Sequence, residues 1–167
     1  MPQLGLGLGL QRANRALFRG LLDQYGGAAA AYSLRALSSG WLAGDVVEVR
    51  RSEDSVQVKV GLVGGIVTLD SKVTNVTETP DQGETLASNL GEFVAASGYA
   101  NPDSLAGAND GFVSTWYDQS GNANNATQIT TTAQPKIVDA GALVTDANGN
   151  NCVQFDGVDD GISSTVT

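Results

Sequence analysis

The chain has 167 residues, enough for one domain with a buried core or two small ones, and combines 21 glycines with only 16% charged residues. This composition is typical of short strands joined by many turns and argues against a helical bundle. With no histidine and a single Cys152, the chain lacks the usual general base, an internal disulfide and a cysteine metal cluster. We expect Cys152 to be a buried thiol in a strand.

The net charge of −9 is unevenly distributed. Residues 1–51 carry six arginines against three acids, a balance of +3, whereas residues 52–167 carry three lysines against fifteen acids, a balance of −12. So acidic a body argues against nucleic acid as a partner, because phosphates need a basic surface. No apolar run approaches the roughly 18 residues of a membrane span, so we expect no membrane insertion. The apolar run near the N-terminus is too short for a signal peptide, which predicts assembly in a cytoplasm.

The N-terminal residues 4–10 alternate leucine with glycine without a break. In an extended chain this spacing puts every leucine on one face. Glycine makes such a strand unstable alone, so we expect it to order on a sheet edge or on another subunit. A terminus that docks on nothing is the alternative.

An amphipathic helix is predicted over residues 11–23, ended by Gly26 and Gly27. Its arginines, Arg12, Arg15 and Arg19, either meet an acidic partner or form a solvated face. Residues 1–25 thus form a predicted N-terminal anchor. The residues expected to dock on a partner are Leu4, Leu6, Leu8, Leu10, Leu17, Phe18 and Leu21.

Residues 26–167 are predicted to form a β-rich domain. Its first expected strands cover 31–37, 46–50, 56–60 and 66–69, the middle two forming a hairpin around the turn 52–54. A polar loop is expected over 71–83, and a helix over 84–97 with the apolar stripe Leu86, Leu90, Phe93 and Val94. Residues 99–111 predict a second loop, and only strands and turns are expected from Phe112 onward.

Three groups of residues could carry chemistry. Alternate oxygen-bearing side chains could bind Ca²⁺, although the same residue types are what a hairpin turn requires; they are Asp118, Ser120, Asn122 and Asn124. Carbohydrate could stack on an aromatic face beside polar groups, with core packing as the alternative; these candidates are Trp116, Tyr117, Asp118 and Asn122. A carboxylate pair for glycoside hydrolysis could come from Asp156, Asp159 and Asp160, with a self-bonded turn as the alternative.

Two blocks carry a resemblance to a known family. The first comprises residues 30–39 and 47–54, and the second runs from Asp110 through Trp116-Tyr117-Asp118-Gln119-Ser120-Gly121-Asn122 to Val138. Both resemble the N-terminal part of fungal-type α-L-arabinofuranosidase B catalytic domains, which implies a concanavalin A-like β-sandwich, or jelly roll. The block 155–160 is similar to a strand and turn of lectin and laminin-G-like sandwiches. The same segment recurs in bacteriophage tail and fibre proteins after a short N-terminal anchor.

The resemblance implies a fold and a phage context, and no hydrolase. In the enzyme family the catalytic carboxylates lie further along the domain than this chain reaches, and its paired cysteines have no counterpart here. We therefore expect that the protein is not an enzyme. We also expect a partial sandwich of seven or eight strands, whose open sheet edges need cover. Further chain could complete the sandwich, neighbouring copies could cover its edges, or the fold could be smaller than that of the family.

The sequence thus predicts a virion structural protein, the attachment region of a phage tail fibre or tail-attached adhesin. Its expected partners are other tail proteins and further copies of itself, with a trimer favoured. A carbohydrate-binding module that recognises a host glycan is the alternative, and an arabinofuranosidase-type hydrolase is a weaker one.

Overall fold

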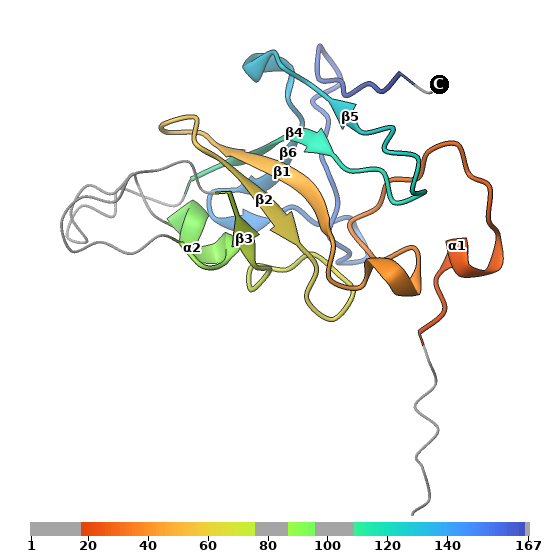
Figure 1. The fold of residues 1–167 in the computed structure, drawn as a ribbon. Helices are drawn as coiled ribbons and strands as arrows, with labels where there is room; N and C mark the ends of the chain where they lie inside the picture. The colour runs from red at the N-terminus through yellow and green to blue at the C-terminus, as the bar shows by residue number, and fades with distance from the viewer. Residues whose placement is uncertain (1–17, 76–86, 96–108, 166–167) are drawn as a thin grey trace, which may run out of the picture.

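The computed structural model describes residues 18–75, 87–95 and 109–165 of the chain. Within these ranges the fold is mainly β, as predicted, with two short helices. One curled antiparallel sheet has the strand order β3-β2-β1-β4-β6-β7, and β5 pairs with β4 beside this path (Figure 1). The second sheet of a sandwich is not among the described residues, so the jelly roll stays a prediction.

The centre of the sheet is the predicted hairpin. Strands β1 (Asp45–Arg51) and β2 (Gln57–Gly61) pair antiparallel around a turn in which Ser55 has a positive φ of 64°. Period-two alternation puts four valines on one face, and all four are at most 1% exposed: Val47, Val49, Val58 and Val60. Burying four such side chains stabilises the sheet by about 1.5–3 kcal/mol each.

The remaining strands extend the hairpin on both sides. Strand β4 (Gly111–Trp116) pairs with β1, and β6 (Lys136–Asp139) pairs with β4. The outer strands are the two-residue β3 (Val73–Thr74), β5 (Ala126–Thr127) and β7 (Ala142–Leu143). Close packing favours glycine at the start of β4, because a Cβ on Gly111 would lie 3.0 Å from a Val49 methyl group.

Helix α2 (Leu90–Ala95) packs against the face of the sheet that carries the buried valines of β1 and β2. Its buried side chains Leu90, Phe93 and Val94 join the valines in one core cluster. They belong to the predicted apolar stripe, whose fourth member, Leu86, lies outside the described residues. Leu34, Leu62 and Val67 complete this side of the core from irregular segments.

The opposite face of the sheet is polar but partly covered. Arg50 is 7% exposed, stacks over the Phe112 ring at 4.9 Å and donates from Nε to Gln134 Oε1 at 2.6 Å. Gln134 follows the short 3₁₀ turn η3 (Thr131–Ala133), which therefore closes this end of the polar face. Burial lowers the pKa of Arg50 from its ordinary value.

The predicted helices are shorter in the structure than in the sequence pattern. Of the helix expected over 11–23, only α1 (Leu21–Gln24) is helical among the described residues; Gly20 before it is extended, and residues 11–17 are not described. Of the helix expected over 84–97, residues 87–89 are not helical, and Asn89 makes an isolated bridge to Lys72 instead. Asn89 caps α2, because its side-chain Oδ1 accepts a hydrogen bond from Glu92 N at 2.9 Å.

Five further predictions are corrected. Residues 31–37 are not a strand, because only Arg35 bridges, to Ile66, and 66–69 likewise contributes that bridge and a turn. The expected loop 71–83 contains β3, since Lys59 and Val60 pair with it. The 99–111 loop ends one residue early, where β4 begins. Cys152 is half-buried and lies beside a single bridging residue, not in a strand.

Candidate functional site

The Asp118 turn, residues 118–124, directly follows β4 and is built around one carboxylate. Asp118 is 2% exposed. Its Oδ1 accepts hydrogen bonds from Ala31 N and Ser120 N, both at 2.8 Å, and its Oδ2 accepts from Ser120 Oγ at 2.7 Å and Asn124 N at 3.1 Å. Each oxygen thus accepts two hydrogen bonds, so the carboxylate is satisfied by the chain itself.

Gln119 makes the same turn hold a distant segment. Its Nε2 donates to the carbonyls of Ser33 at 2.9 Å and Arg35 at 3.0 Å, and its Oε1 accepts from Leu37 N at 2.9 Å. Its own backbone N–H donates to the Ala31 carbonyl at 2.8 Å. Gln119 therefore replaces a neighbouring strand for residues 31–37, which explains why this apolar stretch is ordered without being a strand.

The asparagines of the turn add hydrogen bonds to residues that lie closer to the N-terminus. Asn122 Nδ2 donates to the carbonyls of Ala28 and Ala29, and Asn124 Nδ2 donates to Ala29 O at 2.8 Å. The Tyr32 hydroxyl donates to the Asn124 carbonyl. We call residues 28–37 the clamped segment, because the turn forms hydrogen bonds to backbone groups along its whole length.

The predicted calcium set is thus brought together, but the Asp118 oxygens and the amide nitrogens of Asn122 and Asn124 are bonded to the backbone. Asp118, Ser120, Asn122 and Asn124 all take part in the bonds above. This arrangement favours the turn, and calcium binding there stays a prediction that isothermal titration checks directly. Although burial alone would raise the pKa of Asp118, its hydrogen bonds from Ser120, Ala31 and Asn124 hold the pKa below the ordinary 3.8.

That lowered pKa gives a pH prediction. Because the folded protein prefers ionised Asp118, the carboxylate stabilises the fold above an unfolded pKa of about 3.9, and this contribution is lost as pH falls through the lower folded value. We expect the stability difference between the native chain and the Asp118→Asn variant to shrink below pH 4. Urea denaturation from pH 7 to pH 2.5 measures it, and a difference that is constant over this range would contradict the argument.

Trp116 and Tyr117 point to opposite faces of the sheet, as their adjacency predicts. Trp116 packs against the core, 6.2 Å from the Tyr32 ring, and its buried Nε1 has no hydrogen-bond partner in the described ranges. Tyr117 lies on the polar face, where its hydroxyl donates to Glu48 Oε2 at 2.9 Å and Lys59 Nζ lies 5.5 Å from its ring. Burial raises the pKa of the Tyr117 phenol, and Glu48 raises it further. Of the predicted carbohydrate set, only Tyr117 belongs to this polar face.

Asp156, Asp159 and Asp160 form a turn with carboxylate oxygens within 4.8 Å of one another. Asp156 Oδ1 accepts hydrogen bonds from the backbone N–H groups of Val158, Asp159 and Asp160, and Asp160 Oδ2 accepts from Asp156 N at 2.9 Å. The backbone N–H groups hold the pKa of Asp156 below its ordinary value. These hydrogen bonds are those of a turn whose aspartates bond to their own backbone, which is the alternative to a catalytic carboxylate pair that the sequence also allows.

The clamped segment in turn fixes helix α1. Leu22 N donates to the Leu37 carbonyl at 2.8 Å, and Asp23 accepts from Ser39 N at 2.7 Å and from Gly20 N at 2.9 Å. Hydrogen bonds from Gly20 and Ser39 lower the pKa of Asp23. A continuous chain of contacts therefore runs from the Asp118 turn through residues 28–39 to the start of the described chain.

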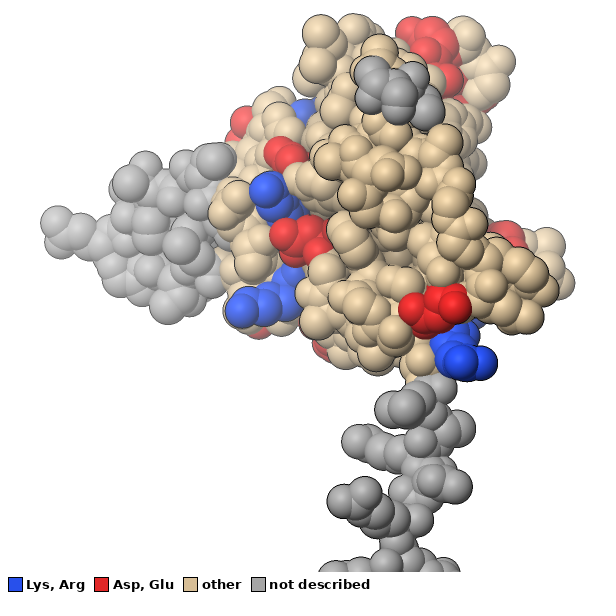
Figure 2. Space-filling view, turned by 45° about the vertical axis from the view of Figure 1, so that its right-hand side comes forward, with Lys and Arg blue, Asp and Glu red and all other residues tan. Residues whose placement is uncertain are grey.

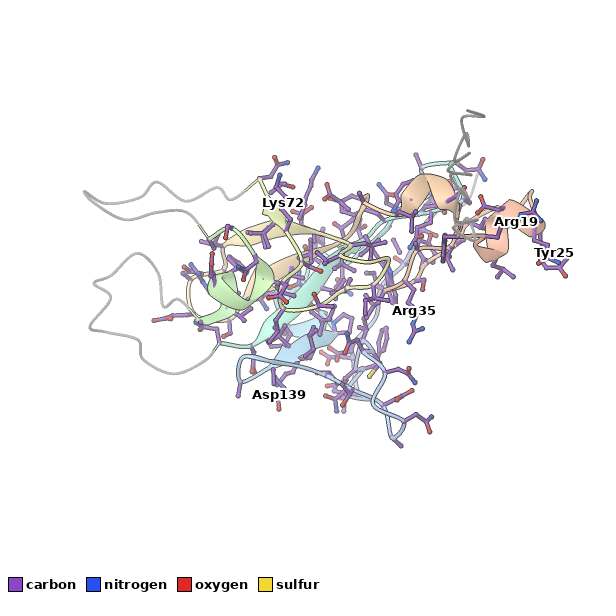
Figure 3. The ribbon with its side chains drawn as sticks, turned by 90° about the horizontal axis from the view of Figure 1, so that it is seen from below. Arg19, Tyr25, Arg35, Lys72 and Asp139 are labelled. Carbon is purple, nitrogen blue, oxygen red and sulfur yellow. The ribbon has the colours of Figure 1, made fainter. Side chains whose placement is uncertain are left out.

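Exposed apolar side chains lie at α1 and around the Gly64–Gly65 turn, on either side of residues 36–37. Phe18 is 43% exposed, Leu21 60% and Tyr25 62%. Figure 3 shows Arg19 and Tyr25 at this outer end, with Tyr25 directed away from the sheet. Beyond the clamped segment, Leu42, Val63 and Ile66 are each about two-fifths exposed. We call this set the apolar end; its members are Phe18, Leu21, Tyr25, Leu42, Val63 and Ile66. The docking candidates Leu4, Leu6, Leu8, Leu10 and Leu17 lie outside the described residues.

Charge is mixed over the described surface. Figure 2 shows basic and acidic residues side by side, without an extended patch of one sign on the face in view. None of the helices in the described ranges has the length and apolar character that a membrane crossing needs. Comparisons with family models, curated proteins and solved structures found no match to this chain. Function must therefore be argued from the apolar end, the Asp118 turn and the polar face.

The sequence singles out the residues of the Asp118 turn but misses what the turn holds. Gln119 is absent from every predicted site. It nevertheless makes more hydrogen bonds to the clamped segment than any of the predicted calcium ligands, three of them through its side chain. A useful signal is the cluster of amide and hydroxyl side chains after an apolar strand, interrupted only by Gly121 and Ala123, which offers donors to a neighbouring backbone.

A substitution at Gly20 tests the contacts by which residues 37–39 hold α1. A Cβ at this position would lie 2.1 Å from the Leu37 carbonyl oxygen, so Gly20→Ala must break the contact with residues 37–39. Because α1 has no buried residue, we expect a loss of only about 1 kcal/mol in global stability. Amide exchange at Leu22 should accelerate strongly, as hydrogen-exchange mass spectrometry would show. The control is Gly26→Ala, whose Cβ meets nothing within 4 Å; equal exchange in both variants would contradict the argument.

Proposed function

We propose that this protein is a virion structural protein, the attachment region of a phage tail fibre or tail-attached adhesin, which docks on the tail through residues 1–25. The observation that carries the proposal is that the chain presents Leu21 to solvent on a short helix, and Phe18 just before it, and that a hydrogen-bond network holds this helix in place. Exposed apolar groups on a fixed support are typical of interaction sites.

The N-terminal sequence supports the same proposal. Leucines on one face of residues 4–10 could add to a sheet edge or an apolar groove of a tail protein. The resemblance of residues 30–39, 47–54 and 110–138 to a segment of phage tail and fibre proteins supports the virion context. The Asp118 turn of the second block forms hydrogen bonds to residues 31–37 of the first.

Photo-crosslinking in purified phage particles tests the attachment. A photoreactive residue at Leu8 or Leu21 should form covalent links to a tail protein that mass spectrometry identifies. The matched control is the same residue at Ile129, which is 92% exposed and lies outside the apolar end. Equal crosslinking from Ile129 and Leu21, or none from Leu8 and Leu21, would defeat the proposal. The proposal includes no catalytic activity.

A carbohydrate-binding module is the second candidate, and the polar face favours it. Tyr117, Glu48 and Lys59 combine an aromatic ring with a carboxylate and an ammonium group on a half-exposed surface, which suits hydroxyl and CH groups of a sugar. A glycan array, with and without Ca²⁺, should then show hits that Tyr117→Ala abolishes and Tyr25→Ala leaves intact. An array without hits in either condition would remove this candidate.

A further inference from the structure

Asn148 is the one asparagine of the sequence that directly precedes a glycine. Both residues are exposed, and a Cβ on Gly149 would meet nothing within 4 Å. The asparagines of the Asp118 turn and Asn151 donate their side-chain amides to backbone carbonyls of distant segments. The Asn148 side chain instead hydrogen-bonds to the Asp146 carboxylate of its own turn, so its position depends on that turn.

The turn that carries this pair, residues 146–150, is organised by Asp146. Gly149 N donates to the Asp146 carbonyl at 3.0 Å, as in a β-turn with aspartate first and glycine fourth. Asp146 Oδ1 accepts hydrogen bonds from Asn148 N and Asn150 N, both at 2.8 Å. Hydrogen bonds from Asn150 and Asn148 lower the pKa of Asp146. The Gly149 nitrogen is therefore held through both the backbone and the side chain of Asp146.

We propose that Asn148–Gly149 is a site of spontaneous deamidation, and that the turn of residues 146–150 sets its rate. The Gly149 nitrogen gives its proton to the solvent and attacks Cγ of Asn148. The bond between this nitrogen and Cγ forms, the Cγ–Nδ2 bond breaks, and Nδ2 leaves with one proton more as ammonia. Water then opens the succinimide ring at either carbonyl, which gives aspartate or isoaspartate without any oxidation or reduction. Glycine permits the attack, because no Cβ stands beside its nitrogen.

The reaction competes with the hydrogen bond that Gly149 N makes in the turn. The nitrogen can attack only after it has left the Asp146 carbonyl, so the turn must first open. An opening confined to an exposed turn needs far less free energy than global unfolding. The folded chain should therefore react, but more slowly than the unfolded chain. This inference is independent of whether the protein attaches to a tail.

Two aspartates that precede glycine could form the same ring, and the structure argues against both. Asp156 Oδ1 accepts hydrogen bonds from three backbone N–H groups, and Asp110 forms an ion pair with Lys136 at 2.8 Å. These contacts favour the ionised carboxylate, which has no leaving group for ring closure. Asp110 and Asp156 should therefore stay unmodified while Asn148 reacts.

Reaction at Asn148 would disturb a contact of the clamped segment. The turn closes a narrow hairpin in which Thr145 bridges to Asn151, and Asn150 Oδ1 accepts from Arg35 Nη2 at 2.9 Å. A new carboxylate at position 148 would lie beside that of Asp146, and like charges repel. Isoaspartate would also lengthen the backbone of the turn. We expect the modified chain to lose the hydrogen bonds that Asp146 accepts, with faster amide exchange at Asn150.

Peptide mapping by mass spectrometry tests the site on the native full-length chain, incubated in mildly alkaline buffer. Deamidation should appear at Asn148 before any other asparagine, as a mixture of isoaspartate and aspartate, with ammonia released in equal amount. Asp110 and Asp156 should contain no isoaspartate after the same time. A different asparagine that reacts first, or a chain that stays unmodified, overturns the proposal.

Two variants test whether the turn sets the rate. Asp146→Ala should deamidate about threefold to tenfold faster than the native chain, because it removes the acceptor of Asn148 N and Asn150 N. The matched control Asp159→Ala changes an exposed aspartate of another turn and should react at the native rate. The native chain unfolded in urea should react at least as fast as Asp146→Ala, a comparison that does not depend on how the variant folds. Equal rates for the two variants, or a slower reaction in urea than in the folded chain, would overturn control by the turn.

Discussion

Replacement of Asp118 by alanine is expected to lower the free energy of unfolding by about 3 kcal/mol. The carboxylate accepts four hydrogen bonds, and its removal leaves the N–H groups of Ala31, Ser120 and Asn124 without their acceptor. Each buried donor that loses its partner costs about 1–3 kcal/mol, and water can reach part of this turn, so the total lies at the lower end of the summed range. Asp118→Asn keeps one acceptor oxygen and should cost about half as much.

Urea denaturation followed by tryptophan fluorescence measures this loss at pH 7. The matched control is Asp159→Ala, an exposed aspartate in another turn, which should change stability by less than about 0.5 kcal/mol. Added Ca²⁺ separates the two interpretations of the turn. If the native chain gains stability with Ca²⁺ and Asp118→Ala does not, the turn binds the metal; a loss below 1 kcal/mol without Ca²⁺ would contradict the hydrogen-bonded clamp.

The sequence predicts the elements whose signals are local. The hairpin of β1 and β2 is correct because alternating valines and the Ser52–Asp54 turn lie within 17 residues of one another. The buried stripe of α2 is correct for the same reason, although capping by Asn89 shortens the helix. Periodicity and turn chemistry act over short distances, so a single sequence is enough to see them.

The candidate site depends on contacts that no local pattern reveals. Gln119 bonds to residues 82–86 positions away, and Asn124 to Ala29 across 95 positions. Residues 31–37 have the composition of a strand, but the polar side chains of the Asp118 turn occupy the place of a neighbouring strand. The same oxygens that suit calcium also suit backbone N–H groups, and only the fold determines which of the two lies opposite them.

The second large effect is expected at Arg51, a residue that the sequence places at an ordinary strand end. Arg51 is 1% exposed, and its guanidinium stacks over the Phe93 ring at 4.7 Å. Its Nε and Nη2 donate to the two oxygens of Asp54, and its Nη1 donates to the Phe93 carbonyl at 2.8 Å. Although burial alone would raise the pKa of Asp54, Arg51 and the Val56 N–H hold it below its ordinary value. One side chain thus joins the β1–β2 turn to α2.

Arg51→Ala should therefore lower the free energy of unfolding by about 2–4 kcal/mol, because it leaves a cavity against Phe93, removes the donor to the Phe93 carbonyl and deprives the partly exposed Asp54 carboxylate of its partner. Arg51→Lys should recover little of this loss, since an ammonium group cannot make the two parallel bonds to Asp54. Arg51→Met retains the packing on Phe93 and should be the mildest of the three. The control Arg35→Ala removes an exposed arginine bonded to Asn150 and should cost less than about 1 kcal/mol. If Arg51→Lys were as stable as the native chain, the bidentate pair would not be what secures α2 to the hairpin, and packing on Phe93 alone would have to account for the burial of this charge.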